Sequence, residues 1–254
     1  MHDKLYVTDN PAQRLYSKIA SRYEGVFEPA LLAENILHTK IRNYIGNGRL
    51  LDAGCGSGRW LSFLPENSCT GIDINFAMLQ AAKEQHPKAN FICADIRNIP
   101  CQDAYFDFII SMFGVISHLT LEEQLIAVQE MKRVLKLGGL AMITTGNVLS
   151  LFSLPVTLRG GRIKIEGERF RIHNLTPTQL KSLLSGFEIL ELGSYDFSFV
   201  PIQAVKLLAT AANRDYRACY SYLMDVYQET TDLPIAQWFG KQLYVIAKKN
   251  REGP

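Results

Sequence analysis

The sequence predicts an α/β protein built around a doubly wound, mainly parallel sheet. Short apolar runs alternate with helical patterns from residue 49 onward, and this alternation places helices on both faces of a parallel sheet. With 254 residues, the chain is long enough for one such domain with a capping insertion. In this fold class ligands bind at the carboxyl ends of the strands. The residues that follow each apolar run are therefore the first candidates for a site.

The strands are expected where apolar residues run together between turn residues. They are residues 49–53, 69–74, 90–95, 105–113, 140–146, 187–197 and 241–249. The helices are expected where apolar residues recur every three or four positions, and they are residues 57–64, 75–85, 121–136 and 176–186. Asn75, Thr120 and Thr176 are suitable N-caps. Gly138 and Gly139 are expected to stop the helix that begins after Thr120.

Three segments fall outside this alternation. Residues 1–48 are interpreted as two helices packed outside the sheet. Residues 147–173 hold turns, apolar pieces and a basic cluster, namely Arg159, Arg162, Lys164, Arg169 and Arg171. Residues 198–240 look helical and are too many for a plain connection between two strands. We expect all three to belong to a single domain that spans residues 1–254.

The composition is that of an ordinary globular protein, with 47% apolar and 20% charged residues. A net charge of +2 is too small to indicate nucleic-acid binding. None of the five cysteines forms a C-x-x-C pair, which favours reduced thiols and a cytoplasmic location. No run is apolar enough for a signal peptide or a membrane span, and no His/Cys/Asp spacing indicates a metal site.

The stretch "LLDAGCGSGRW" (residues 50–60) places Gly54, Gly56 and Gly58 directly after a strand. A dinucleotide-binding turn needs G-x-G-x-x-G, and Arg59 occupies the place of its third glycine. The P-loop pattern is absent as well. The spacing therefore argues against both turns that cradle phosphates, and a plain tight turn remains the alternative.

Two acidic residues end the next two strands. Asp73 could accept hydrogen bonds from the hydroxyls of a ribose, and Asp95 could meet the exocyclic amine of an adenine. Either residue alone could equally be a helix cap. Two of them at successive strand ends, downstream of a glycine turn, describe a nucleoside site.

Five segments in order resemble the motifs of class I S-adenosylmethionine-dependent methyltransferases, in the small-molecule branch that includes ubiquinone and menaquinone methyltransferases. They are "LLDAGCGSG", "GIDINFAML", "ADIRNIP", "FDFIISMFGVISHL" and "RVLKLGGLAMIT". "YSKIASRYE" (16–24) also resembles the helix that closes over the cofactor in that branch. Leu137 departs from the usual proline. The resemblance implies a Rossmann-like, seven-stranded sheet with an antiparallel last strand, and S-adenosylmethionine as cofactor with S-adenosylhomocysteine as product.

The resemblance also implies which residues hold the cofactor. Asp52 and the glycine turn would hold its amino-acid end, Asp73 its ribose, and Asp95 with the Ile96 N–H its adenine. The full set implied is Tyr16, Tyr23, Asp52, Gly54, Cys55, Gly56, Gly58, Arg59, Asp73, Ile74, Met78, Asp95, Ile96, Ser111 and Met112.

The methyl acceptor would lie under the variable segments, so that residues 1–48 form a lid, residues 49–146 the cofactor-binding core, and residues 147–173 and 198–240 the substrate cap. Its aromatic side chains suit an apolar or aromatic small molecule; the candidates for contact are Phe113, Tyr195, Tyr216 and Tyr220. Tyr216 and Tyr220 could instead belong to the core or to a homodimer contact. The basic cluster is either a solvated loop or a surface that steers an acidic substrate.

A hydroxyl acceptor usually needs a general base. His118 is the first candidate and His173 the second, although His118 could merely cap or pack against the following helix. The leading hypothesis is a methyltransferase for an O, N or C atom of a small organic acceptor. The alternatives are an RNA-modifying methyltransferase, a non-catalytic cofactor-binding partner subunit and, disfavoured by Arg59, a nicotinamide oxidoreductase.

Overall fold

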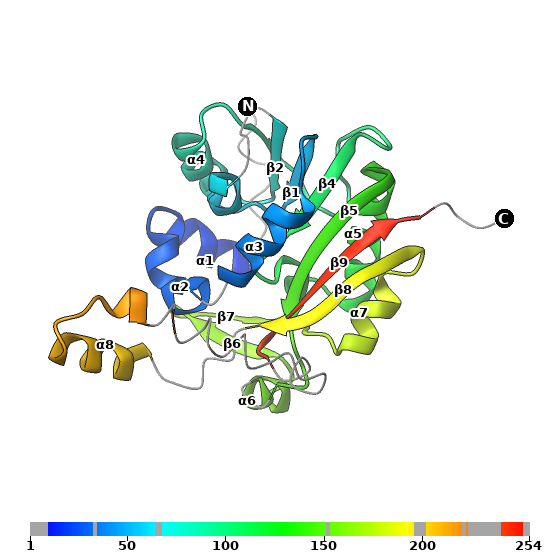
Figure 1. Cartoon of the computed structure of the whole chain (residues 1–254). Coiled ribbons are helices and arrows are strands. Elements are labelled where there is room, and N and C mark those ends of the chain that lie inside the picture. The colour runs from blue at the N-terminus through cyan, green and yellow to red at the C-terminus, as the bar shows by residue number, and fades with distance from the viewer. Residues whose placement is uncertain are drawn as a thin grey trace.

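The computed structural model describes residues 10–32, 35–63, 68–150, 153–195, 202–219, 222 and 240–250 (Figure 1). Seven strands form one sheet in the order β3-β2-β1-β4-β5-β9-β8. Their bounds are β1 Leu50–Ala53, β2 Cys69–Asp73, β3 Asn90–Cys93, β4 Phe106–Ser111, β5 Leu135–Gly146, β8 Phe187–Tyr195 and β9 Gln242–Lys249. The strands from β3 to β5 pair in parallel, while β9 pairs antiparallel with both β5 and β8. The predicted doubly wound sheet with an antiparallel last strand is confirmed.

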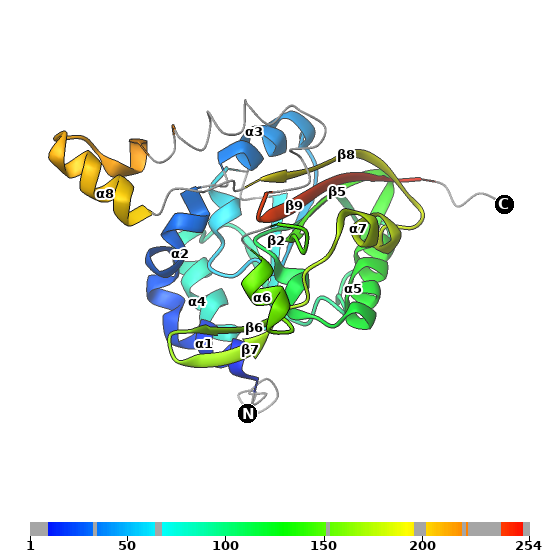
Figure 2. The same ribbon diagram turned by 90° about the horizontal axis from the view of Figure 1, so that it is seen from below.

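Helices cover both faces of this sheet (Figure 2). The helices with described bounds are α1 Pro11–Ile19, α2 Tyr23–Leu32, α3 Asn35–Tyr44, α4 Phe76–Gln85, α5 Leu121–Val134, α6 Leu154–Leu158, α7 Pro177–Leu183 and α8 Ile202–Ala211. Alternate strand residues face opposite sides. Leu51 packs in the core under α5 and α7, whereas its neighbour Leu50 packs in the core under α3. No helix in the described ranges is long and apolar enough to cross a membrane.

The glycine turn after β1 has no room for larger residues. Gly54 has a φ of +87°, and a Cβ there would lie 2.4 Å from Val115 Cγ1. Gly58 has a φ of +80°, and a Cβ there would lie 2.9 Å from the His86 ring. Glycine is the residue that tolerates this backbone. The chain therefore turns sharply at the carboxyl end of β1, and its backbone is not covered by side chains of its own at the turn glycines.

Three sequence predictions of local structure are wrong. The expected helix at 57–64 is a 3₁₀ turn, Arg59–Phe63, because the left-handed glycines before it leave space for only a short, tight turn. The described residues before residue 49, namely 10–32 and 35–48, form three α-helices rather than two. The helix that begins at Leu121 ends at Val134 and not at the two glycines. Leu135 is already extended because it pairs with Phe106 of β4, and this pairing overrides the helical periodicity.

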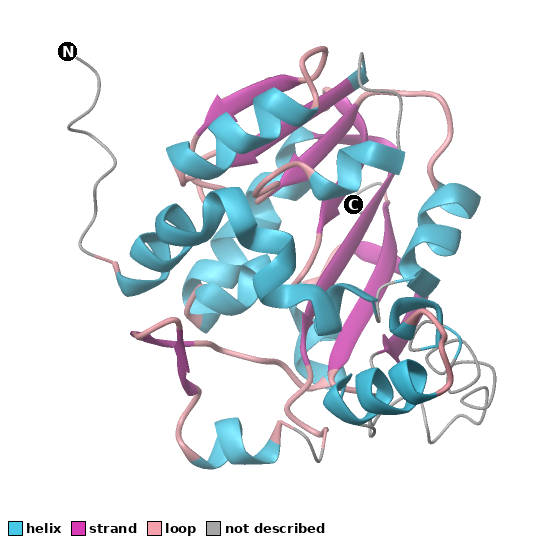
Figure 3. Ribbon diagram, turned by 90° about the vertical axis from the view of Figure 1, so that its left-hand side faces the viewer, coloured by secondary structure: helices cyan, strands magenta, loops and turns pink. Residues whose placement is uncertain are grey.

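The basic segment, interpreted from the sequence as turns, forms a β-hairpin apart from the main sheet (Figure 3). Its strands are β6 Arg162–Ile165 and β7 Glu168–Arg171, paired antiparallel. Both turn residues, Glu166 and Gly167, have positive φ, as the two-residue turn of a tight hairpin requires. Arg14 of α1 pairs with Glu168 at 3.2 Å, and Arg22 pairs with Glu166 at 2.8 Å. These ion pairs attach the hairpin to α1 and to the 3₁₀ turn Ala20–Arg22 that follows it.

Candidate functional site

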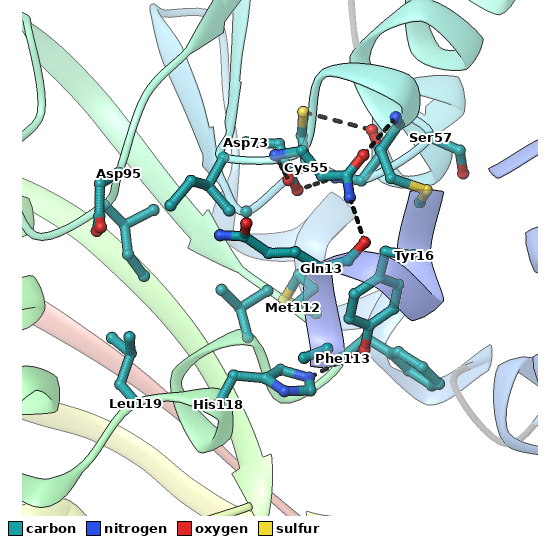
Figure 4. A pocket seen from close by; sticks show the side chains of 18 of the residues that line it. Gln13, Tyr16, Cys55, Ser57, Asp73, Asp95, Met112, Phe113, His118 and Leu119 are labelled. Carbon is teal, nitrogen blue, oxygen red and sulfur yellow. Dashed lines mark hydrogen bonds between the residues drawn. The ribbon is translucent and has the colours of Figure 1, made fainter. Parts of the chain in front are cut away.

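A cavity of about 230 Å³ lies at the carboxyl ends of β1, β2 and β4, beneath α1. Residues from these strand ends, from α1 and from the turn before α5 line it. Figure 4 shows Asp73 and Cys55 at one end of the pocket and His118 and Leu119 at the other. The topology predicts this position, because ligands of doubly wound sheets bind where neighbouring strands diverge.

Twelve of the fifteen predicted cofactor residues line this cavity. They are Tyr16, Tyr23, Gly54, Cys55, Gly56, Arg59, Asp73, Ile74, Met78, Asp95, Ile96 and Met112. The other three, Asp52, Gly58 and Ser111, lie behind the lining. The Ser111 hydroxyl donates to the Ala53 carbonyl at 2.9 Å, so it fixes the strand ends rather than facing the pocket.

Asp73 is held in place by backbone amides. Its carboxylate accepts from the Gly56 N–H at 2.9 Å and from the Asn75 N–H at 2.8 Å. Burial raises the pKa of Asp73, although these hydrogen bonds act in the opposite direction. The side-chain amide of Asn75 donates to the Gln13 carbonyl and to the Ser17 hydroxyl, both at 2.9 Å. Asn75 therefore orients the Asp73 carboxylate through its backbone N–H and holds α1 above it through its side chain.

Asp95 is paired within the chain. Arg97 Nε lies 3.0 Å from both Asp95 carboxylate oxygens, and Arg97 Nη1 also pairs with Glu123 at the start of α5. Burial tends to raise the pKa of Asp95, but the Arg97 hydrogen bonds and charge hold it below its ordinary value. Asp95 therefore stays ionised and fixed in orientation at the pocket wall.

Asp52 is the most unusual carboxylate of the described chain. Its side chain is 1% exposed, and neither carboxylate oxygen has a hydrogen-bond partner among the described residues. Burial, with the charge of Asp73 second, raises its pKa to about 8. The buried Ser57 hydroxyl, on the glycine turn, also has no hydrogen-bond partner there. Polar groups of this kind normally find a partner, so the turn is prepared for polar groups from outside the chain.

At the far end of the cavity, His118 Nε2 and the Tyr16 hydroxyl are hydrogen bonded at 2.9 Å (Figure 4). Burial lowers the pKa of His118 to about 4, so the ring is neutral near pH 7. The Nδ1 atom has no hydrogen-bond partner within the described ranges. Phe113 lines the same end with a φ of +58°, a strained conformation that tends to occur at functional sites.

Aromatic rings surround this end of the cavity. The Tyr16 ring lies 6.1 Å from Tyr23, and the Tyr23 ring lies 6.3 Å from Phe113. Phe170 of the hairpin lies 5.5 Å from the His118 ring. The rings come from α1, α2, the turn after β4 and β7, so this wall exists only when these segments pack together.

The structure does not bring the remaining predicted residues to this cavity. His173 lies outside the lining, where its Nδ1–H donates to the Leu119 carbonyl at 3.0 Å. Tyr195 is buried in the core beside Tyr244 because it ends β8, at the edge of the sheet away from the cavity. Tyr216 follows α8 and contacts Arg217. Tyr220 lies outside the described residues.

Residues 50–139 match the family model described as a methyltransferase domain. This part of the chain is a methyltransferase domain. A structure of an S-adenosylmethionine-dependent methyltransferase from Thermotoga maritima is 16% identical and superposes with a TM-score of 0.64 over 93% of this chain and 99% of that one. The described chain therefore has the fold of that class, whose cofactor is S-adenosylmethionine.

Curated relatives of the methyltransferase domain differ in their substrates. A malonyl-[acyl-carrier protein] O-methyltransferase from Enterobacter lignolyticus is 36% identical over 140 residues, which cover 54% of this chain and 53% of that protein. A tRNA (carboxymethyluridine(34)-5-O)-methyltransferase from Saccharomyces cerevisiae is 28% identical over 131 residues, covering 51% and 46%. The chain thus spans about half the length of the curated relatives it matches.

The sequence patterns did not predict eleven of the residues that line the cavity. The missed residues are Asn10, Ala12, Gln13, Ser57, Trp60, Asn75, Ala94, Arg97, Val115, Leu119 and Glu123. Arg97 could have been found, because it lies two residues after the predicted Asp95. Gln13 carries no local signal, since its place depends on how α1 docks on the sheet.

Proposed function

We propose that the chain is an S-adenosylmethionine-dependent methyltransferase acting on a small organic acceptor of apolar or aromatic character. The observation that carries the proposal is that the two ends of one cavity differ in their chemistry. One end holds the glycine turn with Asp73, and the other holds aromatic rings around a neutral histidine. A cofactor and an acceptor of different chemistry would meet in such a space.

The residues present fit the cofactor. The Ser57 hydroxyl, which lines the cavity and has no hydrogen-bond partner in the described chain, suits its amino-acid end, and the Asp52 carboxyl lies behind the lining there. Asp73, already aligned by two backbone N–H groups, would accept from the ribose hydroxyls, and Asp95 would accept from the adenine amine. When bound, S-adenosylmethionine supplies a methyl group activated by the sulfonium charge. The chain contributes alignment, which can account for about 7–11 kcal/mol of a barrier.

His118 is proposed as the general base for an acceptor hydroxyl. Its neutral ring can accept a proton at Nε2, the atom that is now hydrogen bonded to Tyr16. His118 would take the proton of the acceptor hydroxyl, while bound S-adenosylmethionine would supply the methyl group and leave as S-adenosylhomocysteine. An acceptor hydroxyl on Nε2 would have to displace the Tyr16 hydroxyl. Tyr16 and Phe113 would hold the acceptor ring, while water is excluded by the aromatic wall.

An RNA acceptor is the second candidate. The cationic hairpin favours it, and the yeast relative is named for a tRNA substrate. The aromatic end of the cavity, whose total volume is about 230 Å³, gives more support to a small acceptor. Activity with a labelled methyl donor, screened across metabolite fractions and RNA, separates the two. Label found only in RNA would refute the small-acceptor proposal.

The cofactor proposal has a direct binding test. Calorimetry should show binding of S-adenosylhomocysteine and none of NAD. Asp73→Ala should weaken this binding about 30-fold, because two charge-assisted hydrogen bonds to the ribose are lost. Asp107→Ala, near the amino end of the central strand β4 and outside the cavity lining, is the matched control. No heat with S-adenosylhomocysteine, or equal affinities for Asp73→Ala and the native protein, would refute the assignment.

A further inference from the structure

The outer face of the β6–β7 hairpin carries four cations in two opposed pairs. Arg162 lies opposite Arg171 and Lys164 opposite Arg169, and all four side chains are exposed. Side chains opposed in this way have Cβ atoms about 5 Å apart, and like charges there are destabilising. None of the four has an ion-pair partner in the part of the chain that the structure describes. Repulsion between these cations destabilises the hairpin in the free protein, and an anionic partner would relieve it.

The two glutamates of the hairpin do not neutralise this face. Glu166 and Glu168 are paired with Arg22 and Arg14 on the side that packs against α1. Residues 11–22 and 159–171 together carry eight lysines and arginines but only two acidic residues, while the rest of the chain carries nineteen and twenty-three. Positive charge is therefore concentrated at this corner, although the net charge of the chain is small.

An uncharged apolar segment runs directly into this cationic face. Residues 148–158 read "VLSLFSLPVTL" and contain no charged side chain. Leu158, the last residue of α6, is 78% exposed and is followed by Arg159. Exposed apolar residues next to basic ones are typical of elements that bind at a membrane surface. A nucleic acid would be bound by the cations but would give no reason for an exposed leucine.

The hairpin lies beside the proposed acceptor end of the cavity. It forms part of the aromatic wall through Phe170, which contacts His118. A surface that binds here is therefore next to the proposed acceptor end of the cavity.

We propose that α6 and the β6–β7 hairpin bind the surface of an anionic lipid bilayer. The exposed side chain of Leu158 enters the interface, and the four outer cations lie on the headgroups. The acceptor then reaches the cavity from the lipid phase, a consequence that rests on the proposed function. Because the described helices include no membrane span, the attachment is peripheral and depends on charge.

Vesicle flotation of the full chain tests the electrostatic part. The protein should float with phosphatidylcholine vesicles that contain phosphatidylglycerol, but not with phosphatidylcholine alone, and high salt should release it. Lys164→Gln/Arg169→Gln should weaken binding about 30-fold, since each cation near an anionic surface contributes about a factor of five. Lys88→Gln/Lys181→Gln removes the same charge from exposed sites elsewhere and should leave binding unchanged. Equal losses in the two double variants would overturn the proposal.

Leu158→Ser tests the apolar part, and Leu137→Ser, at an exposed site near the amino end of the interior strand β5, is the control. We expect weaker flotation only for Leu158→Ser, with unchanged salt dependence. If vesicles do not bind, and hairpin-dependent binding of total tRNA is found instead, the partner is a nucleic acid and the membrane proposal is wrong. Calorimetry with S-adenosylhomocysteine on the same variants separates the membrane proposal from the proposed function. If S-adenosylhomocysteine does not bind while vesicle binding is intact, the proposed function alone is refuted.

Discussion

Replacing Asp52 by asparagine should make the stability of the protein less sensitive to alkaline pH. The Asp52 carboxyl is 1% exposed and has no hydrogen-bond partner in the described residues. Burial, with the charge of Asp73 second, raises its pKa from 3.8 to about 8. The folded protein thus keeps a proton near pH 7 that the unfolded chain has lost. Asparagine has no proton to lose, so the variant lacks this coupling.

The sign and size follow from proton linkage. Because the folded pKa exceeds the unfolded one, the stability from this group is fully present below pH 4 and is lost as the pH rises toward 8. His38 and His118 act in the opposite direction, because their folded pKa values are lowered to about 4. Between pH 6.5 and 8 the stabilising contribution of Asp52 should fall by about 1.5 kcal/mol, while that of each histidine still rises by about 0.4 kcal/mol. The histidine changes are the same in the native protein and in an Asp52 variant, so they cancel in the difference between the two.

The measurement is urea unfolding at several pH values from 6.5 to 8. The difference between Asp52→Asn and the native protein should grow by about 1.5 kcal/mol in favour of the variant, with unchanged m-values. Asp107→Asn is the control: hydrogen bonds from Lys136 lower the pKa of Asp107, so its difference should stay constant over this range. Parallel pH curves for Asp52→Asn and the native protein would show that Asp52 is ionised when folded, and would refute the reasoning.

Three further predictions concern the pocket. His118→Gln should lower kcat on a hydroxyl acceptor by about 10²–10⁴-fold without changing the affinity for S-adenosylhomocysteine; undiminished turnover would exclude His118 as the base. Since the pKa of His118 is about 4, kcat/KM should be flat from pH 5 to 7, and a rise through pH 6.5 would contradict a buried, neutral ring. Gly54→Ala should lower the melting temperature and the cofactor affinity, because its Cβ would lie 2.4 Å from Val115; Gly54→Ala/Val115→Ala should regain part of the stability, and no recovery would refute that contact as the cause.

The sequence predicted the sheet and the residues that line the Asp73 end of the cavity because both depend on local signals. Apolar runs located the seven strands, and acidic residues at strand ends located Asp73 and Asp95, which the parallel register brings to one edge. The acceptor end depends on how distant segments dock. Tyr195 shows the difficulty: strand alternation correctly predicts its strand, but this strand pairs with β9 at the other edge of the sheet. Periodicity gives the two faces of a strand and does not give its place in the sheet.

The two ends of the cavity also differ in how firmly they are held. Asp73 and the glycine turn are built on buried parallel strands, with backbone hydrogen bonds fixing the carboxylate. By contrast, the ion pairs between α1 and the hairpin are partly exposed, with side-chain exposures of 47% and 26% for Arg14 and Glu168. Such pairs contribute about 0–1 kcal/mol each.

These ion pairs therefore add little to the cost of separating the hairpin from α1, while separating the strands that hold Asp73 would cost much of the core. If the acceptor enters from a bilayer bound to the hairpin, it must pass between the hairpin and α1, the weakly held part of the wall. Strengthening this contact should then slow acceptor entry and leave cofactor binding unchanged. A disulfide that joins α1 to the β6–β7 turn would test this: when oxidised it should raise KM for a lipid-borne acceptor without altering the affinity for S-adenosylhomocysteine, and an unchanged KM would place the entry route elsewhere.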